Sequence, residues 1–191
     1  MLDRVIPENT VQTLDQLMAK LPAFLAAAPK DTGTLDMIVS RPDHGLRDEP
    51  HSVEVSAKAG IAGDHWAKGC WSALPDGSPN PDVQVCMMMS GCIEAIAGAR
   101  ENWAPAGDNF FLNMDLTPAN MPPGTHFAIG SAEFVVTEEP HNGCQQFIDR
   151  YGRDACLFVN TGKGKELRLR GIYARVTKDG TVSVGDSVRK L

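Results

Sequence analysis

A thiol and an imidazole stand close together in the segment 140–144, Pro-His-Asn-Gly-Cys, so the first chemistry to consider is that of a cysteine. Asn142 can cap a helix that begins here, which would place Cys144 in the first helical turn. Unpaired backbone amides and the helix dipole favour an anion at that position, so we expect a lowered thiol pKa. A thiolate attacks sulfur and binds soft metals, and His141 can assist it by charge or by proton transfer.

The same spacing also allows a purely structural role for Cys144. In a helix over residues 142–151, the cysteine shares one face with three large side chains, those of Phe147, Ile148 and Tyr151. Cys144 can therefore equally be an ordinary core residue, because free cysteines are among the residues most often buried.

The chain has five cysteines, and their number and spacing exclude two common uses of this residue. The total is odd and no pair shows C-x-x-C spacing, which argues against a disulfide framework and against a zinc site built from cysteines. We expect reduced thiols, most of them small buried hydrophobes. The four besides Cys144 are Cys70, Cys86, Cys92 and Cys156.

Two glycine-bracketed segments add polar candidates for a binding site. Gly63, Asp64 and His65 lie together, and the acid and the imidazole can orient a ligand or shuttle a proton. A turn whose histidine is satisfied locally explains them equally well. Asp108 and Asn109 fit either a polar turn that lines a pocket or a turn that bonds its own backbone.

A basic stretch supplies local positive charge in an otherwise acidic chain. Lys163, Lys165, Arg168 and Arg170 share their segment with one acid, Glu166. Such a field can hold a small anionic group, and Arg170, at the start of a predicted strand, is the best-placed contact. The alternative is a solvated turn between two structural elements.

Length, composition and charge limit the fold and the classes of partner. The 191 residues suit one domain, and 42% hydrophobic and 22% charged residues are typical of a soluble globular protein. A net charge of −6 disfavours nucleic acid and anionic membranes as partners. Neither a signal peptide nor a membrane-spanning apolar run is evident, so we expect a cytoplasmic protein. The motifs of P-loop proteins, zinc proteases, α/β-hydrolases and Rossmann folds are also absent.

Hydrophobic periodicity predicts a β-rich domain behind an N-terminal helix. The helix is predicted over residues 11–21, capped by Thr10 and interrupted at Pro22. Asp179-Gly180 predicts a tight hairpin turn with positive φ, and Gly152 the end of a helix. Strands are predicted near 52–57, 83–89, 134–137, 172–176 and 182–184, and short helices near 93–97, 142–151 and 154–160. This pattern indicates a β-barrel or sandwich over 34–191, with 1–33 as a helical extension.

The order of these motifs resembles the MOSC family, named for the C-terminal domain of molybdenum cofactor sulfurase. The resemblance runs from about Ala59 to Val188. Its features are Gly-Asp-His at 63–65, Gly-Asp-Asn at 107–109, the pair Gly143-Cys144, Gly-Ile-Tyr-Ala-Arg-Val at 171–176, and Gly185-Asp186. Many relatives have proline directly before the cysteine, where this chain has Gly143.

The resemblance implies a closed or partly open β-barrel with a few short helices, in the form of a stand-alone prokaryotic-type module. It implies one working cysteine, matched here by Cys144, which either carries sulfur as a persulfide or ligates the molybdenum of a pterin cofactor. The basic segment would then hold the phosphate of that cofactor. The expected activity is that of a sulfurtransferase or of a component of a molybdenum-dependent oxidoreductase.

The residues expected around such a site combine this resemblance with the local patterns described above. His141 would be the second catalytic residue beside Cys144. The expected cofactor-binding residues are Gly63, Asp64, His65, Asp108, Asn109, Asn142 and Arg170. Expected partners are a small-molecule substrate or cofactor and a cysteine desulfurase or reductase, since larger relatives carry their own pyridoxal-phosphate desulfurase domain. The alternative is a non-catalytic small-anion binding module on a β-barrel scaffold.

Overall fold

The computed structural model describes residue 6 and residues 11–191, and its centre is a closed β-barrel. Around the barrel the strands follow the order β1, β10, β6, β7, β8, β4 and β5. Their bounds are β1 Thr32–Ile38, β4 Val85–Met89, β5 Phe110–Asn113, β6 His126–Ile129, β7 Ala132–Val136, β8 Ile172–Lys178 and β10 Ser187–Lys190. Strands β4 and β5 pair in parallel, and the other neighbours in the barrel pair antiparallel. The mainly β architecture predicted from the sequence is confirmed.

A small second sheet lies beside the barrel, in the order β3 (Gly60–Ile61), β2 (Ser52–Ser56) and β9 (Gly180–Ser183). The predicted hairpin at Asp179-Gly180 is wrong, because β9 pairs with β2 rather than with β8. Gly180 is also not among the residues with positive φ. The glycine is needed for a close approach instead, since a Cβ there would lie 2.6 Å from the backbone nitrogen of Ala132.

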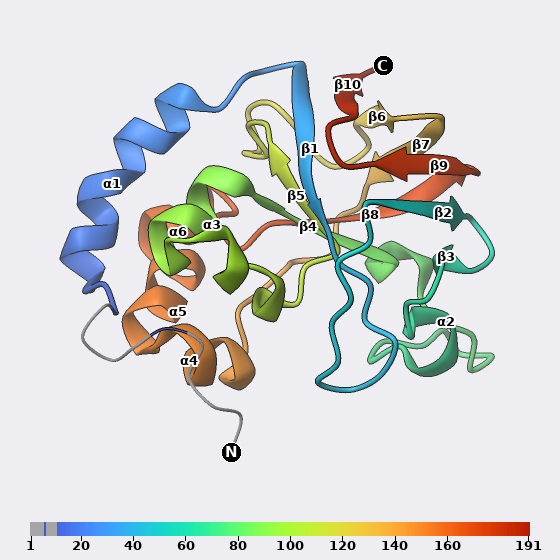
Figure 1. Ribbon diagram of the computed structural model, residues 1–191, viewed down its shortest axis with the longest axis horizontal. Coiled ribbons are helices and arrows are strands. Elements are labelled where there is room, and N and C mark those ends of the chain that lie inside the picture. The colour runs from blue at the N-terminus through green and yellow to red at the C-terminus, as the bar shows by residue number, and fades with distance from the viewer. Residues whose placement is uncertain (1–5, 7–10) are drawn as a thin grey trace.

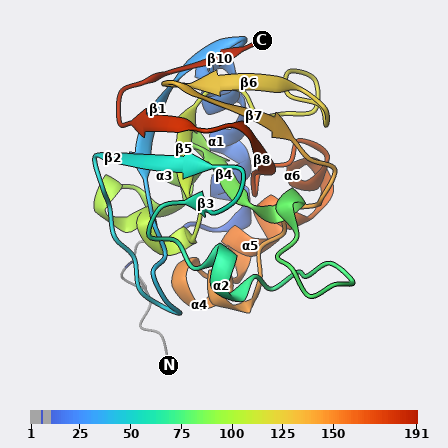
Figure 2. The same cartoon turned by 90° about the vertical axis from the view of Figure 1, so that its right-hand side faces the viewer.

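The helices cover one side of the barrel, except α2, which lies with the small sheet on the other side (Figure 1). Their bounds are α1 Leu14–Ala27, α2 Trp66–Gly69, α3 Ser90–Ala97, α4 Gln145–Tyr151, α5 Arg153–Asn160 and α6 Gly162–Glu166, with single 3-10 turns at Pro81–Val83, Arg100–Asn102 and Ala104–Ala106. Helix α1 packs against α3 and α5. Helix α2 and strands β2 and β3 face the viewer in Figure 2. Among the described residues, no helix has the length and apolarity needed to cross a bilayer.

Helix α1 begins and continues differently from the prediction. Thr10 lies outside the described residues, and Thr13 forms a capping box with Gln16. The helix also runs through Pro22 to Ala27 instead of being interrupted. Pro22 is exposed, so water can satisfy the carbonyl group that loses its hydrogen bond, while Leu21 holds the helix on the core.

Aromatic packing fills the barrel interior. Phe134 stacks on Phe127 with ring centroids 5.3 Å apart and meets Phe110 edge-on at 6.1 Å. All three side chains are buried, and truncating one such ring to alanine costs about 3–5 kcal/mol. The spacing of Val83, Val85, Met87 and Met89 predicts a strand with alternating buried and exposed residues, and this is wrong because every residue of β4 is buried. This rigid barrel holds the ends of β4 and β8 in place beside the loops described next.

Candidate functional site

The loops at one end of the barrel enclose a cavity of about 470 Å³, here called the arginine pocket after Arg41, Arg47, Arg150 and Arg170, which line it. Several predicted site residues share its wall, namely His65, His141, Asn142, Cys144 and Arg170. The other predicted residues, Gly63, Asp64, Asp108 and Asn109, do not line it. The structure therefore brings together the thiol, the imidazoles and Arg170, and places the acids behind them.

Cys144 presents an exposed thiol to this pocket. Helix α4 begins at Gln145, so Cys144 is its N-cap residue and does not lie in the first turn. The predicted cap at Asn142 is wrong, because Asn142 lies two residues before the position of the cap. The alternative of a core cysteine is wrong as well, since the residues of α4 that are buried include Phe147 and Tyr151 but the thiol is exposed.

His141 is a buried neutral base. Its side chain is 6% exposed, and its ring lies 4.5 Å from the ring of Tyr173. Burial, and then the positive charges of Arg170 and Arg41, hold the imidazole pKa well below its ordinary value. At neutral pH His141 therefore carries no charge, and the expectation that it assists Cys144 by charge is wrong.

Arg170 reaches the pocket already paired. Its Nη1 atom donates to Asp108 Oδ1 at 2.9 Å and Oδ2 at 2.7 Å, and its Nη2 atom donates to Ala106 O at 3.0 Å. Burial alone would lower the Arg170 pKa, but the charges of Asp108 and Cys86 and the hydrogen bonds to Asp108 together outweigh burial and raise the pKa. The guanidinium also lies over the Phe147 ring at 4.9 Å. Because Asp108 neutralises it, Arg170 adds little net charge for an incoming anion.

Asp64 and Asn109 form a brace behind Arg41. Asp64 accepts from Arg41 Nε at 2.8 Å and from its Nη2 at 3.1 Å, and also from Trp66 N and Asn109 Nδ2. Burial alone would raise the Asp64 pKa. The hydrogen bonds and the charge of Arg41 outweigh burial, so the Asp64 pKa is lowered. His65 joins the same brace through a contact of 2.7 Å between its Nδ1 atom and Arg41 O. Asp64 and Asp108 therefore position arginines and do not line the pocket, whose acidic lining residue is Asp43.

Arg47 and Arg150 supply the uncompensated positive charge of the pocket, and sequence patterns did not single them out. Within residues 11–191, neither forms an ion pair with a carboxylate, although Arg150 donates to Pro105 O at 2.5 Å. The Arg47 pKa is lowered by burial and then by the charges of Arg150 and Arg41. Arg47 Nε is buried without a hydrogen-bond partner. Of the four arginines that line the pocket, Arg41 and Arg150 repel Arg47, and a bound anion would relieve that repulsion.

Cys86, Asp108 and His141 bring possible metal ligands within 4.8 Å of one another. Two of these three ligand groups are already engaged, because Arg41 Nη1 lies 3.2 Å from Cys86 Sγ and Arg170 binds both Asp108 oxygens, whereas His141 Nδ1 has no hydrogen-bond partner among the described residues. A cation at this point would have to displace two guanidinium groups. The geometry therefore favours an anion in the pocket rather than a metal ion held by these three residues.

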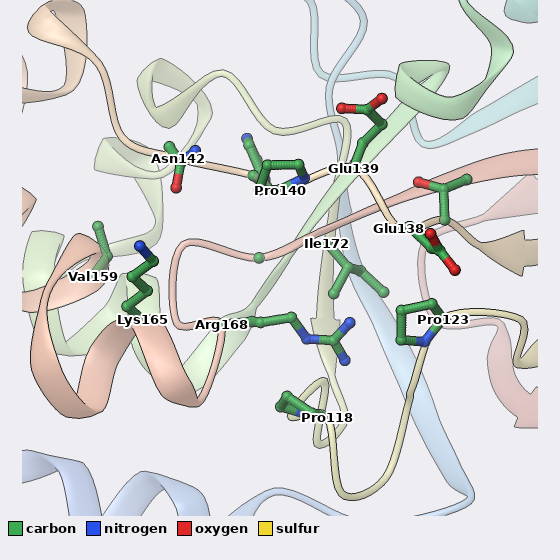
Figure 3. Close-up of a pocket in the computed structure, with 13 residues that line it drawn as sticks. Pro118, Pro123, Glu138, Glu139, Pro140, Asn142, Val159, Lys165, Arg168 and Ile172 are labelled. Carbon is green, nitrogen blue, oxygen red and sulfur yellow. The ribbon is translucent and has the colours of Figure 1, made fainter.

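A second cavity of about 330 Å³ lies on the other side of the segment 140–142, which lines both cavities. Figure 3 shows its charged wall, where Lys165 and Arg168 lie across from Glu138 and Glu139. The predicted basic segment is therefore divided between two cavities. Lys165 and Arg168 face the second one, whereas Arg170 faces the arginine pocket.

Comparisons with known proteins point to one family and one fold. A family model described as the MOSC domain matches residues 80–189. That range includes Asp108, His141, Cys144 and Arg170, but not Arg41 or Arg47. No protein of curated function matches the chain significantly.

Solved structures share the fold at low sequence identity. The YUAD protein from Bacillus subtilis superimposes with a TM-score of 0.54 at 16% identity, over 82% of this chain and 94% of that one. YiiM from Geobacillus stearothermophilus superimposes with a TM-score of 0.54 at 16% identity, over 83% of this chain and 75% of that one. YiiM from Escherichia coli superimposes with a TM-score of 0.52 at 18% identity, over 83% of this chain and 69% of that one. At these identities the likeness concerns the fold alone.

Proposed function

The chain belongs to the MOSC domain family, and on that premise we propose that it is a sulfur-transfer or molybdenum-cofactor-binding protein that works through the thiol of Cys144. The observation that carries the proposal is the exposed Cys144 thiol on the wall of a pocket with surplus positive charge from Arg47 and Arg150. A thiolate is both a nucleophile toward sulfur and a ligand for soft metals. The guanidinium groups suit an anionic acceptor or cofactor.

Persulfide carriage is the chemistry that this geometry supports most directly. A protein donor must reach the accepting sulfur, and Cys144 is exposed at the start of α4. In the transfer, the Cys144 thiolate attacks the outer sulfur of a donor persulfide. One S–S bond forms at Cys144 and one breaks in the donor, whose cysteine leaves as a thiolate. A cysteine desulfurase is the class of partner that supplies such a persulfide.

Molybdenum ligation by the same thiol is the second candidate, and the cations of the pocket favour it. Arg47 Nε is a buried donor without a partner, and Arg41, Arg47 and Arg150 converge on the cavity. These residues fit the phosphate of a pterin cofactor, and Cys144 fits the soft metal. When bound, that cofactor would supply redox chemistry. The protein would contribute the thiol, the anion contacts and the wall formed by His141.

A purely anion-binding module is the alternative that needs no thiol. It predicts equal affinity for a phosphate-bearing ligand in the wild type and in Cys144→Ala. Sulfur transfer and molybdenum ligation both predict a defect in that variant. The comparison therefore separates the module from the two cysteine chemistries.

Intact-mass spectrometry tests the leading proposal. The protein is incubated with a cysteine desulfurase and free cysteine, and its mass is read before and after reduction. We expect one added sulfur atom on Cys144, removed by a reductant and absent from Cys144→Ser. Cys70→Ser is the matched control, because Cys70 is a partly exposed thiol near the same pocket and should leave the adduct intact. A wild-type protein that gains no sulfur from this donor or from polysulfide would overturn sulfur carriage. Metal analysis of protein from a cofactor-competent host tests the second candidate.

A further inference from the structure

A second thiol lies directly beneath the loop that carries Cys144. Cys156, on α5, is 8% exposed. A Cβ atom placed on Gly143 would lie 3.3 Å from Cys156 Sγ, which is tighter than ordinary van der Waals contact. The buried sulfur thus touches the backbone of the residue immediately before Cys144. Because Gly143 has no Cβ atom, it leaves room for this sulfur.

Asn160 fastens the loop and the second thiol together. Its Oδ1 atom accepts from Gly143 N at 2.8 Å, and its Nδ2 atom donates to Gly143 O at 2.9 Å. The same Nδ2 atom lies 3.2 Å from Cys156 Sγ. One side chain therefore fixes both peptide groups of Gly143 and the sulfur of Cys156, so the neighbourhood of the two cysteines is a built feature of the fold.

The charge of Cys144 also affects the ionisation of Cys156. Burial raises the pKa of Cys156, the charge of ionised Cys144 raises it further, and the hydrogen bond from Asn160 opposes both effects. While Cys144 is a thiolate, Cys156 is therefore held protonated. A neutral substituent on the Cys144 sulfur removes that charge, which makes the Cys156 thiolate easier to form.

We propose that Cys156 is the resolving thiol of Cys144. This role rests on the proposed function, in which Cys144 carries a persulfide. The Cys156 thiolate attacks Cys144 Sγ, the inner sulfur, and the outer sulfur leaves as hydrosulfide. A Cys144–Cys156 disulfide forms as the persulfide S–S bond breaks, so no outside oxidant is needed. A dithiol reductant then returns both cysteines to thiols with two electrons and two protons.

The other cysteines are held away from this role. Cys86 also lines the arginine pocket, but its sulfur is engaged by Arg41 Nη1 and Asn109 Oδ1. Cys92 is fully buried in the core behind β4. Cys70 packs beside Val83 and Tyr173 in a separate small cluster. Contact with the Cys144 loop therefore singles out Cys156.

An aromatic disulfide reagent tests the pairing without any persulfide. Dithionitrobenzoate is added at one equivalent to wild type, Cys156→Ser, Cys144→Ser and the control Cys70→Ser. We expect Cys144 to be labelled first with release of one thionitrobenzoate, and Cys156 then to expel the second. Wild type and Cys70→Ser should end as an unlabelled disulfide that peptide mapping assigns to Cys144 and Cys156. Cys156→Ser should keep the label, with an unchanged unfolding midpoint showing that it is folded.

A persulfide arm then tests the functional step. Protein loaded by a desulfurase should lose its extra sulfur as hydrosulfide in the wild type and retain it in Cys156→Ser. The rate in the wild type should rise with pH, because the Cys156 pKa is raised.

The two arms separate the possible failures. A wild type that keeps the aromatic label as long as Cys156→Ser overturns the resolving role, as does a disulfide mapped to Cys86. Rapid resolution of the label together with no persulfide on any variant supports the pairing and overturns the proposed sulfur carriage instead. Equal persulfide lifetimes in wild type and Cys156→Ser overturn the resolving step even if Cys144 carries sulfur.

Discussion

Arg170 and Asp108 form a buried ion pair in which a single guanidinium nitrogen donates to both carboxylate oxygens, at 2.9 and 2.7 Å. The side chain of Asp108 is fully buried and that of Arg170 is 7% exposed. Asp108 lies in the turn before β5, and Arg170 lies in the loop that leads through Gly171 into β8. The ion pair therefore ties together two loops that both contribute to the wall of the arginine pocket, through Ala106 and Gly107 on one loop and Arg170 on the other.

Replacing Asp108 by Asn should strongly destabilise the protein. The substitution leaves the Arg170 charge buried without a counterion, which costs about 3–5 kcal/mol. Urea unfolding followed by circular dichroism measures the loss. The control is Asp82→Asn, since Asp82 pairs with Arg175 at 3.4 Å on the surface and should change stability by about 0–1 kcal/mol. Equal effects of the two substitutions would contradict the importance of burial.

Replacing Arg47 by Met should weaken anion binding to the arginine pocket. Arg47 lacks an ion-pair partner among the described residues and has a buried Nε donor free for a ligand. A hydrogen bond to a charged group is worth about 1.5–3 kcal/mol, so we expect roughly a tenfold to hundredfold loss of affinity. Calorimetric titration with inorganic pyrophosphate provides the measurement. Arg153→Met, an exposed arginine that does not line the pocket, is the control for loss of one overall charge. A similar loss in both variants would show a non-specific effect.

His141 should make the protein less stable in mild acid. Its folded pKa lies well below the ordinary value of 6.5, so the unfolded chain binds the proton more tightly than the folded chain does. The stabilisation is complete above the unfolded pKa and is lost as pH falls below it toward the folded value. We expect the urea midpoint to fall between about pH 7 and pH 5, and the slope to be smaller in His141→Gln. His126→Gln, at an exposed site, should keep the wild-type slope. An unchanged slope in His141→Gln would refute the assignment.

Pro22→Ala should stabilise α1 without affecting the pocket. Pro22 lies inside the helix and is exposed, so alanine restores a backbone donor where nothing obstructs it. The gain should be about 1–3 kcal/mol, because proline in a helix interior costs about 3 kcal/mol and the flexible unfolded chain recovers part of that. Urea unfolding measures the gain in stability. The affinity for pyrophosphate should stay unchanged, because the pocket is not affected. A loss of stability would mean that the helix depends on the constraint of the proline ring.

The sequence was sufficient to predict the β-rich class, the helical end at Gly152 and the meeting of His141, Cys144 and Arg170 around one site. Some of these predictions depend on local signals, such as a glycine at the end of a helix. The others depend on motifs whose order resembles that of a known family. The end of α4 is an example of a local signal, because Gly152 has a φ of 94°, a backbone conformation that favours glycine.

The charge of the pocket could not be predicted, because it depends on which arginines find acids across the fold. Arg41 meets Asp64 over a separation of 23 residues, and Arg170 meets Asp108 over 62. Those pairings neutralise Arg41 and Arg170. The net positive charge of the pocket therefore comes from Arg47 and Arg150. Two strands were misjudged for the same reason, since distant segments determine the burial of β4 and the pairing partner of β9.

The segment 140–142 lines both the arginine pocket and the second cavity, so the two cavities share one wall. A ligand that displaces this segment from one cavity also changes the shape of the other. For two ligands coupled in this way, each changes the affinity of the other by the same factor. Cys144 follows this shared segment by two residues and lines the arginine pocket.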